Sequence, residues 1–163
     1  MGKPRSKVKG VLSATAADND LPLMRVPLAL ARHFIQICTE ASSDVLASEG
    51  MKTGQFSVLA HLSREPGIDQ STLAVRIGVE PARVSQLADE LDAMGLIDRR
   101  VNGTDRRARV LSLTPRGEAV RARLQPAVRK AQTRVIASLS VQERELLLDL
   151  LVRVIQANRA PSK

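Results

Sequence analysis

The 163-residue sequence predicts a mainly α-helical fold with one small β-hairpin. Apolar residues recur every three or four positions over most of residues 26–158, which is the period of an amphipathic helix. Residues 96–113 alternate instead, as two short strands do, around Asn102-Gly103, a favoured hairpin turn. Only two residues are aromatic, so Leu, Val, Ile and Ala must build the core.

The N-terminal part predicts a tail followed by one long helix. Residues 1–20 are basic and polar without periodicity, which is typical of a disordered tail. Within residues 21–50, an apolar stripe predicts a helix from about Val26 to Ser48, which Gly50 ends.

Residues 51–95 predict three shorter helices. The first covers residues 53–64. Asp69 is a suitable N-cap for a helix over residues 70–77, which Gly78 ends. Pro81 then opens a helix over residues 81–94, because proline is favoured in a first turn, and Gly95 follows it.

Residues 115–160 predict two further helices after the hairpin. Thr114 and Pro115 begin a helix that runs to about Ser138, and Pro126 within it predicts a kink or a break. Ser140 and Glu143 form a capping box at the start of the last helix. The predicted order is four helices, a hairpin and two helices.

The third and fourth predicted helices have the spacing of a helix-turn-helix. A small residue, Ala74, permits a close helix crossing, Gly78 supplies a positive φ in the turn, and Val84 packs the second helix against the first. A plain pair of packed helices is the alternative, because such spacings are common.

A helix docked in this way presents its N-terminal side chains to the DNA major groove. Here Arg83 can pair with guanine and Gln86 with adenine. The predicted contact residues on this helix are Ala82, Arg83, Ser85 and Gln86, with Asp89 further along.

The hairpin concentrates positive charge beside this helix. Residues 97–134 contain eleven Arg or Lys and only three Asp or Glu. Three helices followed by a two-stranded hairpin predict a winged helix, whose arginines can enter a minor groove. The predicted wing contacts are Arg106, Arg107 and Arg109, with Asp105 as a local ion-pair partner; a solvated charged face is the alternative.

Residues 26–158 resemble the MarR family of bacterial transcription regulators. The most specific part is GLIDRRVNGTDRRARVLSLTPRGEAV, residues 95–120, in which Asp105-Arg106-Arg107 is similar to the family's wing signature. Two positions depart from the family pattern. Asn102 stands where an acidic residue is frequent, and Glu80 stands where a Ser, Thr or Asp cap is usual.

The resemblance implies a homodimer on a palindromic DNA operator, with release when a small ligand binds. Residues 51–114 would form the DNA-binding lobe, and residues 21–50 and 115–160 the dimerisation region. The long apolar terminal helices independently favour a dimer, because a small domain cannot easily bury both. Two-fold symmetry would place two recognition helices about one DNA turn apart.

The resemblance also implies a ligand pocket between the two regions. Its candidate residues are Arg32, His33, Ile37 and Phe56, with Phe34 nearby. Arg32 or His33 could anchor the carboxylate or phenolate of an aromatic ligand, an expectation at the level of the family. The alternative for the apolar members is ordinary core packing.

Cys38 suggests a second mechanism of sensing. Some members of the family sense organic peroxides through a cysteine on the first helix. A reactive thiol needs a nearby cation or a helix N-terminus, whereas Cys38 lies mid-helix among apolar neighbours. A buried structural cysteine is therefore the competing interpretation.

Other classes of function find little support in the sequence. There is no phosphate-binding glycine loop, no nucleophile with a base and no cofactor motif, so an enzyme is not expected. The two histidines, His33 and His61, lie on different predicted helices, so no metal site is expected. No apolar run is long enough to span a membrane, and a cytoplasmic location is expected. A non-regulatory winged-helix scaffold remains an alternative.

Overall fold

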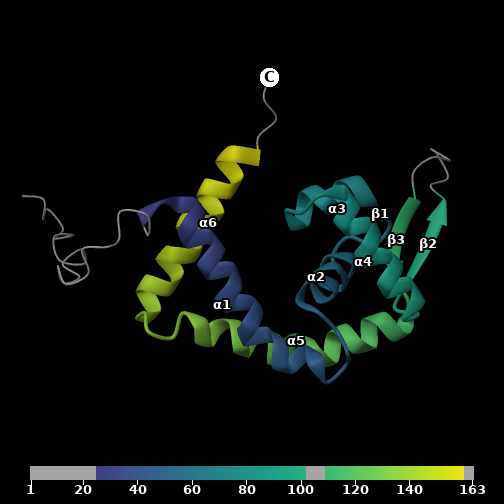
Figure 1. Cartoon of the computed structure of the whole chain (residues 1–163), viewed down its shortest axis with the longest axis horizontal. Coiled ribbons are helices and arrows are strands. Elements are labelled where there is room, and N and C mark those ends of the chain that lie inside the picture. Colours follow the sequence, from purple (N-terminus) through teal and green to yellow (C-terminus); the bar gives the residue numbers. More distant parts are fainter. Residues whose placement is uncertain (1–24, 102–108, 160–163) are drawn as a thin grey trace, which may run out of the picture. The chain divides into compact units, whose positions relative to one another are not determined.

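The computed structural model describes residues 25–101 and 109–159 (Figure 1). Within them the predicted mainly α fold with a small sheet is confirmed. The elements in chain order are α1 (Pro27–Ala47), α2 (Thr53–Leu62), β1 (Ile68–Asp69), α3 (Gln70–Ile77), α4 (Pro81–Ala93), β2 (Ile97–Val101), β3 (Arg109–Leu113), α5 (Pro115–Val135) and α6 (Val141–Arg159).

The described residues fall into two units, one that ends at Gln36 and one that begins at Ile37. The boundary falls inside α1, so the second unit holds the end of α1 and every later element. The division into a DNA-binding lobe at residues 51–114 and dimerisation segments on either side stays a prediction. The predicted tail, residues 1–20, lies outside the described residues.

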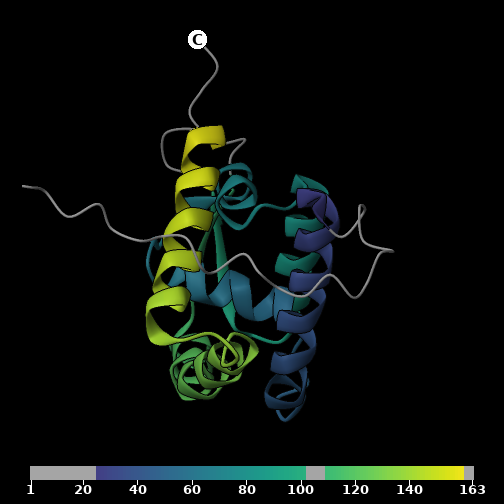
Figure 2. The same cartoon turned by 90° about the vertical axis from the view of Figure 1, so that its left-hand side faces the viewer.

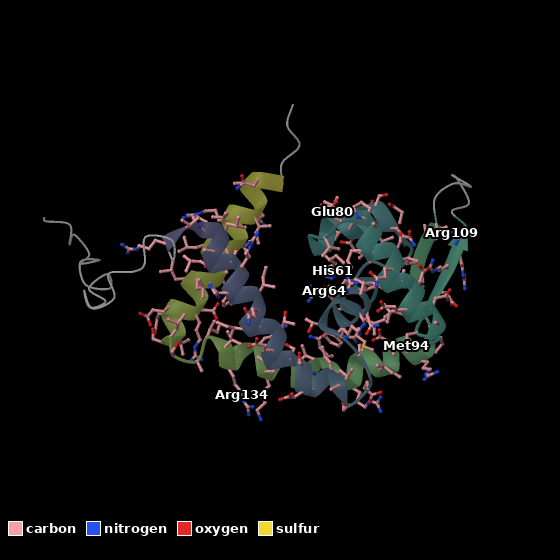
Figure 3. The ribbon with its side chains drawn as sticks, in the orientation of Figure 1. His61, Arg64, Glu80, Met94, Arg109 and Arg134 are labelled. Carbon is pink, nitrogen blue, oxygen red and sulfur yellow. The ribbon has the colours of Figure 1, made fainter. Side chains whose placement is uncertain are left out.

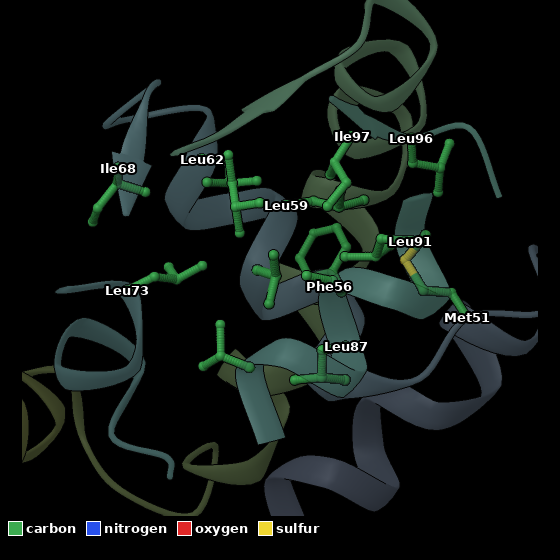
Figure 4. Packing of buried hydrophobic residues seen from close by; sticks show 14 of the residues in the cluster. Met51, Phe56, Leu59, Leu62, Ile68, Leu73, Leu87, Leu91, Leu96 and Ile97 are labelled. Atoms are coloured by element: carbon green, nitrogen blue, oxygen red, sulfur yellow. The ribbon is translucent and has the colours of Figure 1, made fainter. Parts of the chain in front are cut away.

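A largely aliphatic core joins the end of α1, α2, α3, α4, the sheet and the middle of α5 (Figure 4). Phe56 is the aromatic residue within it, and leucines supply most of its volume, as the composition predicts. Its most deeply buried members are Leu46, Val58, Leu59, Leu62, Leu73, Val84, Leu87, Leu91, Leu96, Ile97 and Leu111. This core fixes the helix-turn-helix against the sheet.

The predicted helix ends are confirmed at several positions. The Asp69 carboxylate accepts a hydrogen bond from the Thr72 backbone N–H at 2.9 Å, so it caps α3. Gly78 ends α3 with a φ of 70°, a conformation that glycine adopts without a steric penalty. At the start of α6, Ser140 N–H donates to the Glu143 carboxylate at 2.8 Å, which completes the predicted capping box.

The sheet has three strands where the sequence predicts two. Its order is β1-β3-β2, and both pairs are antiparallel. β2 pairs with β3 as the predicted hairpin, from Ile97 opposite Leu113 to Val101 opposite Arg109. β1 was not predicted; it pairs Ile68 with Leu111. The predicted element order is therefore wrong by one strand, which links the segment before α3 to the hairpin.

α5 is one helix in spite of its internal proline. The sequence predicts a kink or a break at Pro126, and a break does not occur, because the helix runs without interruption from Pro115 to Val135. Leu124 and Val128 on either side are buried in the core cluster, and this packing holds the helix together across the missing N–H. The helix ends a few residues earlier than predicted.

One arginine closes the turn between α5 and α6. The Arg144 guanidinium donates to three carbonyl oxygens at 2.8–3.0 Å, those of Ile136, Ala137 and Leu139. These groups lie just beyond the end of α5, where helical hydrogen bonding stops. Arg144 thereby joins the first turn of α6 to the end of α5.

α6 is a continuous helix (Figure 2), and many of its apolar side chains are exposed. Exposed apolar side chains also occur along α1, at Leu28, Leu30, Ile35 and Ile37. The exposed members on α6 are Val141, Leu146, Leu148, Leu150, Leu151, Val152, Val154 and Ile155. Contiguous apolar surface on a helix commonly marks an interaction site.

Across residues 25–101 and 109–159, none of the helices has both the length and the apolar character that a membrane crossing requires.

Candidate nucleic-acid interface

The helix-turn-helix consists of α3, the turn at Gly78 and α4. Ala74 and Val84, the two predicted packing positions, are buried. The N–H groups of Gly78 and Val79 both donate to the Ala74 carbonyl oxygen, at 2.9 and 3.1 Å, which closes the end of α3. The predicted motif is therefore confirmed as a packed helix pair.

α4 begins at Pro81 with Glu80 as its N-cap residue, and Figure 3 labels Glu80 and Met94 at its two ends. The Glu80 side chain makes no capping hydrogen bond. The departure noted at this position in the sequence is therefore visible in the structure, because the usual Ser, Thr or Asp would cap through its side chain.

The predicted contact residues of α4 differ in exposure. Ala82, Arg83 and Gln86 are exposed, whereas Ser85 is half-buried. Arg83 Nη1 donates to Gln86 Oε1 at 2.6 Å, so the two base-reading candidates form one hydrogen-bonded pair. The Ser85 hydroxyl donates to Gln70 Oε1 at 3.2 Å and therefore ties α4 to the start of α3.

The sequence reasoning missed Glu90, which continues the same polar row on α4. Gln86 Nε2 donates to Glu90 Oε1 at 3.2 Å, and Gln55 Nε2 on α2 donates to Glu90 Oε2 at 2.7 Å. The signal in the sequence was the spacing of residues 83, 86 and 90, which places them on one face of a helix.

A second missed residue, Arg99, joins the hairpin to α4. Its side chain is only 14% exposed, and Nη2 lies 2.6 Å from Asp89 Oδ1. Nε lies 3.6 Å from Asp92 Oδ2 and makes no hydrogen bond within the described residues. Asp89, which the sequence places at the end of the DNA-facing set, instead binds the first strand of the wing.

The wing is described only at its base. Arg109, one predicted contact, is exposed at the start of β3 (Figure 3). Its neighbour across the hairpin, Val101, ends β2. The predicted tip contacts Arg106 and Arg107, together with Asn102 and Asp105, lie outside the described residues.

The base of the wing is fixed to the start of α5. The Thr114 hydroxyl donates to the Gly95 carbonyl oxygen at 2.9 Å and accepts from the Gly117 N–H at 3.0 Å. The Thr114 N–H donates to the Leu96 carbonyl oxygen at 3.1 Å. Thr114 thus acts both as the predicted cap of α5 and as a clamp between the two ends of the hairpin.

The predicted ligand-binding residues differ in their exposure to solvent. Arg32 and His33 are exposed on the part of α1 that belongs to the first unit. Ile37 is exposed and Phe34 is half-buried. Phe56 is 5% exposed within the hydrophobic core, which agrees with the core-packing alternative.

A cationic hollow of about 210 Å³ lies at the end of α2, a location that sequence reasoning did not indicate. His61 Nδ1 lies 2.8 Å from the Ser57 carbonyl oxygen, which can only accept a hydrogen bond, so Nδ1 is the donor in this contact. Arg76 Nε lies 3.4 Å from Glu65 Oε2. The hollow is lined by His61, Arg64, Glu65, Ile68 and Arg76, and Figure 3 labels the first two.

The environment of Cys38 is that of a protonated thiol. The side chain is partly buried, and this burial raises the pKa of the thiol above its ordinary value. A raised pKa lowers the thiolate fraction at neutral pH, and the thiolate is the reactive species.

Groups of three or more His, Cys, Asp or Glu side chains that could hold a metal ion do not occur in the part of the chain that the structure describes.

Comparison with known proteins identifies the family. The family model described as MarR family matches residues 49–108. A curated relative from Thauera aromatica, named as a transcriptional regulatory protein for the hcr operon, is 32% identical over 155 residues, which cover 94% of this chain and 89% of the relative.

Solved structures agree with the sequence relatives. The PcaV transcriptional regulator of Streptomyces coelicolor, in complex with its natural ligand, is 30% identical with a TM-score of 0.74, covering 88% of this chain and 99% of PcaV. The transcriptional repressor CouR, bound to a 23-mer DNA duplex, is 26% identical with a TM-score of 0.73, covering 85% of this chain and 99% of CouR. The chain belongs to the MarR family of winged helix-turn-helix, DNA-binding transcription regulators.

Proposed function

We propose that this regulator is a repressor that binds a palindromic operator as a homodimer and leaves it when a small ligand binds. The observation that most supports sequence-specific binding is the hydrogen-bonded pair of Arg83 and Gln86, which is exposed on α4 beside the wing. Arg and Gln are side chains that discriminate guanine and adenine in the major groove. The similarity to CouR, which is bound to a DNA duplex, supports the same assignment.

The test is selection of bound sequences from a random duplex library at near-physiological salt, with labelled DNA as the readout. A palindrome with half-sites about one helical turn apart is the expected result. Binding that depends on salt but enriches no sequence would refute the proposal and favour a non-regulatory scaffold, because phosphate contacts alone produce such binding.

Individual contacts can then be assigned. We expect Arg83→Ala to relax discrimination at one base pair of each half-site, by about 1–3 kcal/mol. Arg109→Ala at the base of the wing should weaken binding to all sequences evenly, as loss of a backbone contact does. Gln86→Ala should likewise relax discrimination at one base pair, and Arg107→Ala should weaken binding to all sequences evenly.

The exposed apolar face of α6 supports the homodimer. Leu150 is 39% exposed and Val154 is 60% exposed in the single chain. They lie four residues apart, on one face of the helix, and a second copy could cover both at a symmetric interface. Sedimentation at micromolar concentration is expected to give a dimer. Val154→Asp should shift it toward monomer, whereas Gln156→Asp, two residues further and on the opposite side of the same helix, serves as a control for charge. A monomeric parent protein would contradict the dimer.

The cationic hollow supports an anionic effector. Two arginines, a histidine and one carboxylate line this hollow, which has a volume of about 210 Å³. That volume is below the roughly 300–1,000 Å³ of a pocket for a drug-sized ligand. Such a space suits a single-ring aromatic or phenolic acid. The similarity to PcaV, which holds its natural ligand, supports a response to a small molecule. The candidates Arg32, His33, Ile37 and Phe56 remain an alternative set.

The effector is tested by adding single-ring aromatic acids to the protein bound to labelled operator. We expect one class to release the DNA, and Arg64→Ala to raise the concentration needed by about tenfold. Arg129→Ala, which removes an exposed arginine elsewhere, should not change it. If both variants release the DNA at the same concentration of acid, the hollow is not the effector site, and the alternative set of Arg32, His33, Ile37 and Phe56 remains.

A further inference from the structure

A buried glutamine at the start of α2 fixes one end of a row of hydrogen bonds. Gln55 is 4% exposed, and its Oε1 accepts from the Lys52 backbone N–H at 2.7 Å. A backbone N–H can only donate, so the amide oxygen must face it and Nε2 must point the other way. Nε2 donates to Glu90 Oε2 at 2.7 Å. The amide of Gln55 therefore has one permitted orientation.

Glu90 transmits this orientation to the DNA-facing side of α4. Its carboxylate accepts two amides, from Gln55 at Oε2 and from Gln86 at Oε1, the latter at 3.2 Å. Lys52 Nζ lies 4.0 Å from Oε2, so a cation lies beside the carboxylate. An ionised carboxylate can only accept hydrogen bonds, so the Gln86 amide must direct Nε2 toward it.

The row ends at the guanidinium of Arg83. With Gln86 Nε2 directed at Glu90, Gln86 Oε1 faces the opposite way and accepts from Arg83 Nη1 at 2.6 Å. A reversed Gln86 amide would point its NH₂ group at the guanidinium and its oxygen at the carboxylate, and neither contact could form. The donors and acceptors are thus fixed from the Lys52 backbone to Arg83.

This order determines what the helix offers to DNA. A glutamine reads adenine through its oxygen and its NH₂ group at once, so the direction of the amide decides which base edge it matches. We propose that Glu90 is a specificity-determining positioning residue, which selects the base pair read by Arg83 and Gln86 without contacting DNA. This inference rests on the sequence-specific binding proposed above.

Two simpler roles for Glu90 make different predictions. As a charge alone, it would repel phosphates, and its removal would strengthen binding to every sequence evenly. As a packing contact between α2 and α4, its removal would lower the melting temperature and leave base preference intact. A hydrogen-bond row predicts altered preference at one base pair of each half-site.

The experiment measures competition between the selected operator and its single-base variants, with circular dichroism to follow unfolding. Glu90→Ala removes the carboxylate. Gln55→Met keeps the shape and the Glu90 charge but removes the buried amide. Glu80→Gln is the control, because it removes one negative charge from the start of the same helix, where the side chain makes no capping hydrogen bond.

We expect Glu90→Ala and Gln55→Met each to reduce discrimination about tenfold at the same base pair. The double variant should be no worse than either single variant, because all three interrupt one row. Glu80→Gln should change affinity for all operators evenly. In NMR spectra of the side-chain amides, the Gln86 NH₂ signal of Glu90→Ala should be shifted from its position in the parent.

The proposal is overturned if Glu90→Ala behaves as Glu80→Gln does, or if a folded Gln55→Met keeps full discrimination. If Gln55→Met fails to fold, the comparison of Glu90→Ala with Glu80→Gln and the Gln86 signal still decide. A parent protein that enriches no sequence would refute the proposed function instead. A parent that enriches a palindrome, with variants of unchanged preference, refutes only the role of Glu90.

Discussion

Gly117 lies against the carbonyl oxygen of Leu96, so closely that a Cβ atom at position 117 would overlap with that oxygen. The same carbonyl accepts the Thr114 N–H, and Gly117 itself donates to the Thr114 hydroxyl. The first turn of α5 can therefore approach the start of the wing only because position 117 has no side chain.

Gly117→Ala should consequently destabilise the protein. The neighbouring group is backbone and cannot rotate away, so we expect a loss of about 3 kcal/mol in the free energy of unfolding, at the upper end for overpacking. Urea denaturation followed by circular dichroism measures it. Ala119→Ser, on the exposed side of the same turn, should change stability by less than about 0.5 kcal/mol. Equal effects from both substitutions would contradict the close approach.

Arg99→Met should loosen the wing without changing base preference. The substitution keeps the aliphatic volume and removes the hydrogen bond to Asp89, leaving two carboxylates on α4 without their arginine. We expect a loss of about 2 kcal/mol in stability, as for other charged hydrogen bonds, and evenly weaker DNA binding. Arg100→Met is the matched control, because the Arg100 side chain is 77% exposed and lies 4.0 Å from the Asp98 carboxylate. A changed base preference in Arg99→Met would count against this role.

The cap of α3 should make stability depend on pH in acid. Hydrogen bonds from the Thr72 side chain, and then from its backbone, lower the pKa of Asp69 below its ordinary value. A lowered pKa stabilises the fold above the ordinary value, about pH 4, and this contribution is lost as the pH falls through the lower folded pKa.

Asp69→Asn tests this dependence, because asparagine still accepts from the Thr72 N–H but does not titrate. At pH 7 the parent should be more stable by less than about 1 kcal/mol. The difference should shrink as the pH falls from 5 to 3, measured by urea denaturation at each pH. A difference that stays constant over this range would show that the carboxylate charge contributes nothing.

Cys38→Ser should leave the response to peroxide unchanged. The raised pKa of the partly buried thiol keeps it protonated at neutral pH, and a protonated thiol reacts slowly. Operator binding is compared for the parent and the variant after treatment with an organic peroxide. Release of the parent but not of the variant would establish thiol sensing, the alternative that the sequence left open.

Features that depend on residues close in the sequence could be predicted. The Asp69 cap spans three residues, Gly78 supplies its own φ, and the box of Ser140 and Glu143 also spans three residues. Each is determined by local backbone geometry, which a single sequence records directly. The positions of α3 and α4 follow from these local signals.

Features that join distant parts of the chain could not be predicted. β1 is two residues long and exists only because Ile68 pairs with Leu111, far along the chain. The Gln55–Glu90 hydrogen bond joins residues 35 positions apart. The sequence pattern at Pro126 predicts a kink or a break, yet the helix does not break, because burial of Leu124 and Val128 outweighs the missing hydrogen bond. Phe56 could be assigned to a pocket or to the core until its neighbours were known.

The order of the strands has a further consequence for solubility. A sheet with open edges can recruit a strand from another molecule and so begin aggregation. Here β3 is covered on both sides, one edge strand is only two residues long, and the other, β2, carries Asp98, Arg99 and Arg100 in succession. A short edge and a charged edge both discourage strand addition. The sheet is thus protected against uncontrolled edge-to-edge association, which leaves the apolar helical surfaces for self-association.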